Sequence, residues 1–204
     1  METSENTAVN SIIIESSEED LTEEFVRSAF GLDHLIGVRS SHEPTDGFRG
    51  FSISLVFDQP ADVDMTAAAA VEAGAQMVKP VSKSFWGYGG SLRSPDGTVW
   101  TLASSAKKNT AEPTGLASQI VLLVGVDDVR ATKDFYRDRG IEVSRGFGSK
   151  YVEFDTGSTI TLAIQSRRAV AKNAGVDPEG SGSHRLTIAG TLGEFVDPDG
   201  FTWR

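Results

Sequence analysis

One short motif occurs twice and restricts the fold more than any other feature of the chain. Residues 95–100 read PDGTVW and residues 198–203 read PDGFTW. Proline presets the backbone of a tight turn, and Asp and Gly suit the positions after it. In both copies a strand-like segment ending in Trp follows, so each copy predicts a β-hairpin. The same hairpin in both halves of the chain predicts a tandem repeat of one α+β unit.

The segments around the two motifs follow a similar order. Apolar or alternating runs predict strands, and Leu21, Phe25 and Ala29 predict the buried face of a first helix capped by Ser17. A second helix is expected to begin at the cap Asp62 and to bury the stripe Val63, Ala67, Ala70 and Val71. The expected strands are 11–16, 34–40, 48–57, 76–81, 89–93, 98–103, 119–126, 150–164 (a hairpin), 183–190 and 192–204 (a hairpin), with further helices over 127–140, capped by Asp127, and 167–175.

A polar stretch near the middle predicts a domain boundary. Residues 104–115 lack apolar periodicity and include Pro113 and Gly115. That composition is typical of a linker. We therefore expect a first domain over 1–105, a linker over 106–114 and an abbreviated second domain over 115–204. The sequence also stops inside an expected strand at Arg204, which suggests that the natural chain continues.

Composition excludes several classes of function. The chain has 19 basic and 29 acidic residues, a net charge of −10, and its basic residues are scattered, which argues against a nucleic-acid partner. Without cysteine it can form neither disulfides nor thiolate sites. The N-terminus lacks the pattern of a signal peptide, and the longest apolar run, residues 120–126, is too short to span a bilayer. We expect a cytoplasmic protein with no membrane partner.

The motifs together resemble the vicinal oxygen chelate superfamily, which includes glyoxalases, bleomycin resistance proteins and extradiol dioxygenases. The resemblance is carried by GFRGFSISLVFDQPADVDMTAAAAVEAGAQMV, GYGGSLRSPDGTVWTL, VDDVRATKDFYRDRGIEV and GEFVDPDGFTW, which together cover most of residues 11–204. It implies tandem glyoxalase-like domains of paired βαβββ modules, whose curled mixed sheets surround a ligand cleft. Modules of this superfamily pair within or between chains, so the resemblance also allows a homodimer. The first and last modules look abbreviated.

The resemblance implies a divalent metal held by His on the opening strands and Glu after each PDG turn. Most of these positions carry other residues, with Thr101 and Arg204 where Glu is expected. Only His184 matches, and Glu153 is a second carboxylate on a nearby strand. These two are the metal ligands if any metal binds; otherwise His184 is a strand-end histidine bonded to the backbone. We expect no cofactor. Asp96 and Asp199 are interpreted as structural turn residues.

The leading hypothesis is a protein that binds a small organic molecule in a cleft without a complete metal site. No catalytic residue can be named from the sequence. The alternative is a metal-dependent lyase, isomerase or dioxygenase with a degenerate site at His184 and Glu153, and a third interpretation is a structural or partner-binding domain pair. Aromatic residues suit pocket walls, although core packing explains them equally well. The expected ligand-binding residues are Trp86, Tyr88, Trp100, Tyr151, Glu153, His184 and Trp203.

Overall fold

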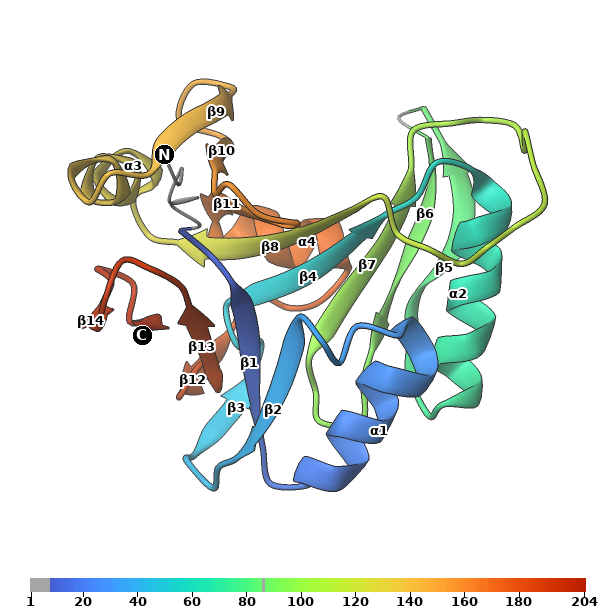
Figure 1. Ribbon diagram of the computed structural model, residues 1–204, viewed down its shortest axis with the longest axis horizontal. Helices are drawn as coiled ribbons and strands as arrows, with labels where there is room; N and C mark the ends of the chain where they lie inside the picture. Colours follow the sequence, from blue (N-terminus) through green and yellow to red (C-terminus); the bar gives the residue numbers. More distant parts are fainter. Residues whose placement is uncertain (1–7, 86) are drawn as a thin grey trace, which may run out of the picture.

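The strands form two large sheets that share one apolar core (Figure 1). The structure, a computed structural model, describes residues 8–85 and 87–204. The larger sheet has eight strands. In spatial order they are β5 (Gln76–Ser84), β6 (Gly87–Arg93), β7 (Val99–Ser104), β4 (Phe51–Val56), β8 (Gln119–Val126), β11 (Ile160–Ser166), β10 (Val152–Asp155) and β9 (Glu142–Gly146).

Two complete modules make up this larger sheet. In β4–β7 and again in β8–β11, the first strand pairs parallel with the last, and the remaining pairs are antiparallel. Their first strands, β4 and β8, pair antiparallel at the centre. Each module carries one helix after its first strand, α2 (Pro60–Glu72) and α3 (Val129–Asp138). The expected α+β fold built from βαβββ modules is therefore confirmed, whereas the repetition of one unit along the whole chain stays a prediction.

The smaller sheet contains the abbreviated modules. Its five strands, in spatial order, are β14 (Phe195–Val196), β15 (Thr202–Trp203), β13 (Leu186–Ala189), β1 (Ser11–Ser16) and β2 (Ile36–Ser40). β1 pairs antiparallel with β13, as β4 does with β8. After helix α1 (Glu19–Phe30), the first module returns directly to β2, and the described residues between β13 and β14 contain no helix. The short strands β3 (Thr45–Gly47) and β12 (Gly180–Gly182) form a separate pair.

The strand pairing crosses the expected domain boundary. β4 lies before the predicted linker and β8 after it, yet they are neighbours in one sheet. β1 and β13 connect the two halves in the same way. The two halves therefore do not each close a sheet of their own, which the division at residues 106–114 had implied. The exact limits of any domains stay a prediction.

The segment predicted as a linker is fastened to helix α2. Asp62 does not cap this helix, which begins two residues earlier at Pro60; its carboxylate instead accepts N–H groups from Thr114 and Gly115 at 2.6 and 2.8 Å. Desolvation by burial acts to raise the pKa of Asp62, but the N–H donors outweigh it and hold this pKa below its usual value. The segment is thus an ordered connection between the modules.

The starts of α1 and α3 also differ from the predicted caps. The N-cap residue of α1 is Glu18, whose side chain caps nothing, and the hydroxyl of Ser16, not that of Ser17, accepts the Glu18 N–H at 3.0 Å. Asp128, rather than Asp127, caps α3 by accepting the N–H groups of the second and third helical residues. The strands before both helices end where they were predicted to end, at Ser16 and Val126, so the difference lies in the turn that leads into each helix.

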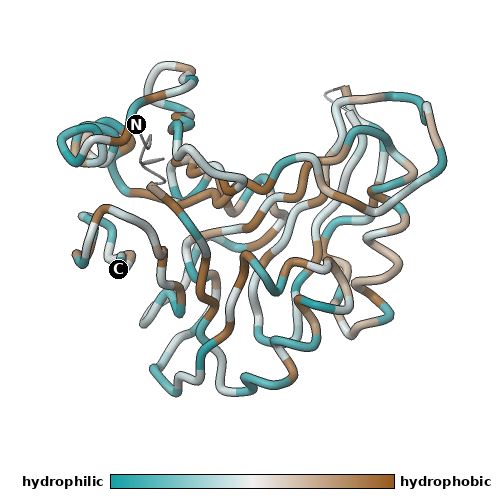
Figure 2. The backbone as a smooth tube through the Cα atoms, in the orientation of Figure 1, coloured by the Kyte–Doolittle hydropathy of each residue, from teal (hydrophilic) through white to brown (hydrophobic). Residues whose placement is uncertain are grey.

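The buried faces of the helices differ from the prediction at two positions. Leu21 is 61% exposed and Val71 is 47% exposed, because the stripe facing the core is rotated around each helix axis. α1 buries Thr22, Phe25, Val26 and Ala29, and α2 buries Pro60, Asp62, Val63, Thr66, Ala67 and Ala70. Figure 2 shows apolar residues concentrated in the strands that face this core. None of the described helices is long and apolar enough to cross a bilayer.

Candidate functional site

The two faces of the larger sheet have different chemistry because side chains alternate along each strand. The face toward α2 and α3, called here the inner face, carries residues such as Ile53, Trp100 and Leu122, none exposed by more than 1%. The opposite face, called the outer face, carries mostly hydroxyls and small side chains. In register, one row across its centre is Thr101, Ser54, Val121 and Thr161.

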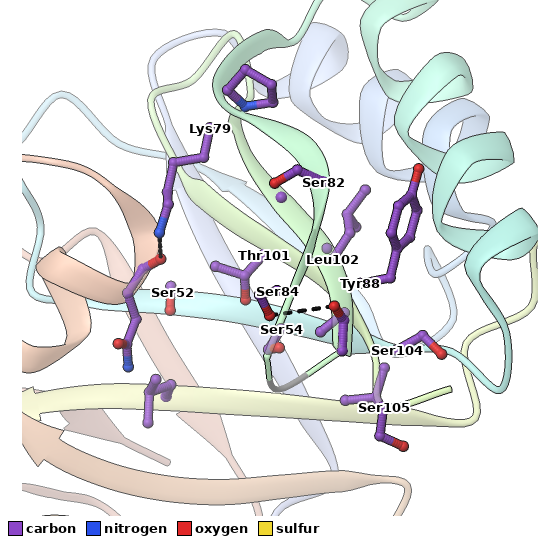
Figure 3. Close-up of a pocket in the computed structure, with 18 residues that line it drawn as sticks. Ser52, Ser54, Lys79, Ser82, Ser84, Tyr88, Thr101, Leu102, Ser104 and Ser105 are labelled. Carbon is purple, nitrogen blue, oxygen red and sulfur yellow. Dashed lines mark hydrogen bonds between the residues drawn. The ribbon is translucent and has the colours of Figure 1, made fainter. Parts of the chain in front are cut away.

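A groove runs across this outer face. One pocket of about 630 Å³ lies over β5, β6, β7 and β4, and a second of about 310 Å³ continues over β8 to β10. Both are lined by Ser54, Val56, Leu123 and Asn173, so they form one groove rather than two sites. The larger pocket falls within the range of pockets that hold small organic molecules, roughly 300–1,000 Å³. Figure 3 shows its hydroxyl-rich lining.

Helix α4 (Arg167–Ala174) closes one end of the groove. It follows β11 directly and packs onto the outer face, where it buries Val170, Ala171 and Ala174 against Phe48 and Val99. At its C-terminal end the carbonyls of Asn173 and Ala174 accept hydrogen bonds from the sheet. The donors are Lys79 Nζ, at 3.0 Å, and Ser91 Oγ, at 2.5 Å. α4 therefore fills part of the outer face and leaves the rest open.

Glycines bring the strands of the groove wall close together. A Cβ atom on Gly89 would lie 2.3 Å from the Leu102 carbonyl oxygen, and one on Gly90 would lie 2.7 Å from the Lys79 carbonyl oxygen. Both distances are far below van der Waals contact. The glycine-rich segment after residue 86 is thus a site of close backbone approach, as such segments in strands often are, and it lines the larger pocket.

A charged cluster lies at the far end of the groove. Arg145 donates two hydrogen bonds to Glu153 Oε2, at 2.8 and 3.2 Å, and the Tyr151 hydroxyl donates a third to the same oxygen at 3.1 Å. Burial, together with the adjacent Glu153 carboxylate, raises the pKa of Tyr151. Tyr151 and Glu153 both line the smaller pocket, which places these two sequence-predicted residues at the groove.

Comparison with solved structures gives the fold an identity. Glyoxalase I from Zea mays superimposes with a TM-score of 0.58 at 15% identity, covering 96% of this chain and 90% of that one. A proposed dioxygenase from Bacillus subtilis gives 0.56 at 10% identity, covering 95% and 72%. The chain has a glyoxalase-like fold. No family model and no curated protein matches the chain, and at these identities the likeness concerns the glyoxalase-like fold alone.

The groove residues do not fit the divalent metal that the resemblance to the vicinal oxygen chelate superfamily implies. On the opening and closing strands of the two complete modules, the outer face presents Ser54, Thr101, Gln119 and Gln165. Gln119 donates to Thr161 at 3.0 Å. Glu153, the one carboxylate among the described residues of the groove lining, is held by Arg145. Among the residues that the structure describes, no three His, Cys, Asp or Glu side chains are grouped as a metal site would require.

His184 and Glu153 do not lie in a common site. His184 precedes β13 of the smaller sheet and lines a separate pocket of about 220 Å³, whereas Glu153 lies on β10 of the larger sheet. The two ring nitrogens of His184 face carbonyl oxygens, Nδ1 that of Arg49 at 2.5 Å and Nε2 that of Asp199 at 2.9 Å. The ring also stacks on Phe201. This is the backbone-bonded strand-end histidine considered above.

The tryptophans and tyrosines expected to line a cleft have different positions. Trp100 and Trp203 are at most 1% exposed and belong to the core, so the prediction that they face a ligand is wrong. Both occupy inward positions of the alternation. Tyr88 lines the larger pocket at the side of α2, where its hydroxyl donates to Asp64 at 2.7 Å, and Figure 3 shows its ring directed toward that helix. Trp86 lies outside the described residues.

The Asp residues of the two PDG turns have structural contacts. Asp96 accepts hydrogen bonds from Ser94 Oγ, at 2.5 Å, and from the Arg49 guanidinium, at 2.9 Å. Asp199 accepts the Asp127 N–H and the Thr132 hydroxyl, both at 2.7 Å, and so fastens the second turn to α3. These contacts agree with the interpretation of both residues as parts of the turns.

Sequence reasoning missed the floor of the groove. Ser52, Ser54 and Thr101 are small and belong to no motif, so a search for large aromatic or metal-binding side chains passes over them. The signal was the alternation itself: FSISLV and VWTLAS place Phe51, Ile53, Leu55, Trp100 and Leu102 on one face, and Ser, Thr, Ala and Val on the other. A polar outer face on central strands, which are ordinarily covered on both sides, marks the groove.

Proposed function

We propose that the protein binds a small organic molecule in the groove on the outer face of the larger sheet, without a bound metal. The observation that carries this proposal is the groove itself, a pocket of about 630 Å³ on the central strands β4 and β7, lined by hydroxyl and small apolar side chains. Pockets with this mixture bind ligands by shape and a few hydrogen bonds. The bleomycin-resistance branch of the superfamily is the analogy for such a role.

The metal-dependent alternative has less support from the geometry. His184 and Glu153 line different pockets, and the polar atoms of both have other partners. Seryl, threonyl and glutaminyl side chains in the groove can orient a ligand through hydrogen bonds, but they are weak ligands for Zn, Ni, Mn or Fe. The proposal is therefore sequestration or recognition of a ligand rather than Lewis-acid catalysis.

A groove-filling variant tests the proposal. A library of small organic molecules is screened by ligand-observed NMR against the wild type, Ser54→Phe and the control Thr202→Phe. Ser54 lines both parts of the groove, whereas Thr202 is an exposed residue of the smaller sheet. We expect ligands of the wild type to be lost in Ser54→Phe and kept in Thr202→Phe. Ligands that bind all three proteins equally would contradict the groove as the site.

A second measurement addresses the metal. The protein is incubated with Mn, Fe, Ni, Co and Zn salts in turn, desalted and analysed for metal. We expect no stoichiometric retention. Retention that is lost in both His184→Ala and Glu153→Gln, together with turnover of a methylglyoxal–thiol adduct or a catechol, would replace the proposal with the metal-dependent alternative.

A further inference from the structure

The charges in the groove are distributed unevenly. Lys79 is the one charged residue among those that line the larger pocket, and it takes part in no ion pair within the described chain. At the other end, Arg145 and Glu153 neutralise each other. The groove therefore has a local charge of about +1 in a chain whose net charge is −10. A lone cation there contrasts with an acidic protein surface, and attracts a ligand of opposite charge.

The position of the Lys79 ammonium group is defined by α4. Lys79 pairs with Ser91 in the β5–β6 ladder, and Ser91 faces the end of α4, so the lysine side chain extends over the outer face. Its methylene groups pass over Gly175, where an added Cβ would lie only 2.5 Å from them. Nζ donates one hydrogen bond to the Asn173 carbonyl. An ammonium group has three N–H donors, so two remain for a ligand.

A second donor at the same end of the pocket, the hydroxyl of Ser52, is also available to a ligand. Ser52 is 1% exposed, and its hydroxyl makes no hydrogen bond within the described structure. A buried hydroxyl without a partner costs roughly 1–3 kcal/mol. Ser52 lines the larger pocket, and Figure 3 shows it beside α4, on the same side as Lys79. An anionic oxygen bound there would satisfy the hydroxyl as well as the ammonium group.

The rest of the lining is suited to a hydrocarbon group. Val56, Ala103 and Leu123 are partly exposed on the outer face, and Pro80 lies at the rim. Building on the proposed function, we infer that the ligand is a small organic anion, whose charged group binds Lys79 and Ser52 and whose apolar part covers Val56, Ala103 and Leu123. Carboxylates and phosphate monoesters share this chemistry.

Matched probes separate the charge of a ligand from its shape. Benzoate, phenyl phosphate, neutral benzamide and cationic benzylamine are titrated into the ¹⁵N-labelled full chain. The variants are Lys79→Met, Lys79→Arg and the control Lys83→Met. Lys83 lies on the same strand as Lys79, but it is paired with Tyr88 and faces the opposite side of the sheet. We expect at least one of the two anions to bind about tenfold more tightly than benzamide, a difference that corresponds to one ion pair of about 1.4 kcal/mol.

The variants then assign that preference to Lys79. It should disappear in Lys79→Met, remain in Lys79→Arg and Lys83→Met, and weaken as salt is added. Which anion binds better distinguishes a carboxylate from a phosphate ligand. Equal binding of benzoate, phenyl phosphate and benzamide to the same groove amides, or a preference that persists in Lys79→Met, would overturn the inference and leave the proposed function intact. Absence of shifts at the groove with all four probes at millimolar concentration, and with the library ligands, would overturn both.

Discussion

The two sheets start from the same arrangement of paired modules and reach different results. In the larger sheet both modules keep four strands, and the outer face is broad enough to form a groove. In the smaller sheet both are abbreviated, and the outer face carries a compact polar network in which Arg39 donates to Thr187 at 3.1 Å and Thr187 donates to Glu15 at 3.0 Å. The comparison shows that the groove of the larger sheet depends on the strands on either side of the central antiparallel pair. The central pair itself forms in both sheets, even where those strands are missing or short.

The largest loss of stability is expected from disrupting a buried ion pair beside the contact between the two sheets. Arg49 precedes β4, its carbonyl oxygen faces Nδ1 of His184, and its buried guanidinium pairs with Asp96. Burial lowers the pKa of Arg49, and Asp96 partly compensates. Asp96→Asn would leave a buried cation without a counter-charge, and we expect the free energy of unfolding to fall by about 3–5 kcal/mol. Urea denaturation measures this, and a loss below about 1 kcal/mol would show that the pair is not needed.

The next effect concerns the contact that fastens the second PDG turn to the larger sheet. The buried Tyr136 hydroxyl of α3 donates to Asp197 at 2.5 Å. Tyr136→Phe removes this donor from a buried carboxylate, so we expect a loss of about 1.5–3 kcal/mol in unfolding free energy. Phe135→Leu, on the same helix but half-buried, is the comparison for lost ring contacts. Equal losses in the two variants would contradict a role for the hydroxyl.

The same carboxylate should give the stability a pH dependence. Burial raises the pKa of Asp197 above its usual value, so the folded state binds this proton at a higher pH than the unfolded state does. The contribution of Asp197 to stability is therefore complete below its unfolded pKa and is lost as pH rises through its folded pKa. As pH rises through this range, we expect the wild type to lose stability relative to Asp197→Asn, measured as the difference between their free energies of unfolding. A difference independent of pH would refute the raised pKa.

Two buried hydroxyls compare the outer faces directly. Ser52 of the larger sheet and Thr187 of the smaller are each 1% exposed, but only Thr187 has hydrogen-bond partners. Thr187→Val should therefore destabilise the protein by about 1 kcal/mol, whereas Ser52→Ala should be neutral or stabilising by a similar amount. Thermal and urea unfolding of both variants test this. A clear loss of stability in Ser52→Ala would mean that its hydroxyl has a partner in solution and weaken the case for a ligand there.

The smallest effect is expected at the surface. Arg27 and Glu24 form an ion pair on α1 in which both side chains are more than half exposed. Glu24→Gln should change the unfolding free energy by less than about 0.5 kcal/mol, and added salt should reduce even that. This variant also provides the baseline for Asp96→Asn, since both remove one carboxylate from a pair with arginine. A similar loss of unfolding free energy in the two variants would show that the buried Arg49–Asp96 pair stabilises the protein no more than an exposed pair does.

Local pattern predicted most elements, and the resemblance to a known family predicted the fold, but neither predicted which residues line the groove. The turn chemistry of residues 95–97 and 198–200 and the apolar run of β8 are local signals, and both were confirmed. The pairing of β4 with β8 depends on contacts between segments far apart, which no local pattern encodes. Trp100 and Trp203 illustrate the limit, because an aromatic residue in a strand suits a pocket wall and a core equally, and only the facing of the strand decides between them.

The antiparallel pairing of β1 with β13 has a consequence for how the chain is made. Ser11 is the partner of Ala189, so one edge of β1 can pair early with β2, but its other edge stays open until β13 has been synthesised. Such distant pairings slow folding and leave the apolar edge of β1 exposed in the meantime. The larger sheet, whose central strands β4 and β8 are much closer in sequence, can assemble earlier and offer a surface on which the first strand is held. β13, β14 and β15 thus complete the smaller sheet after the larger sheet beside them has formed.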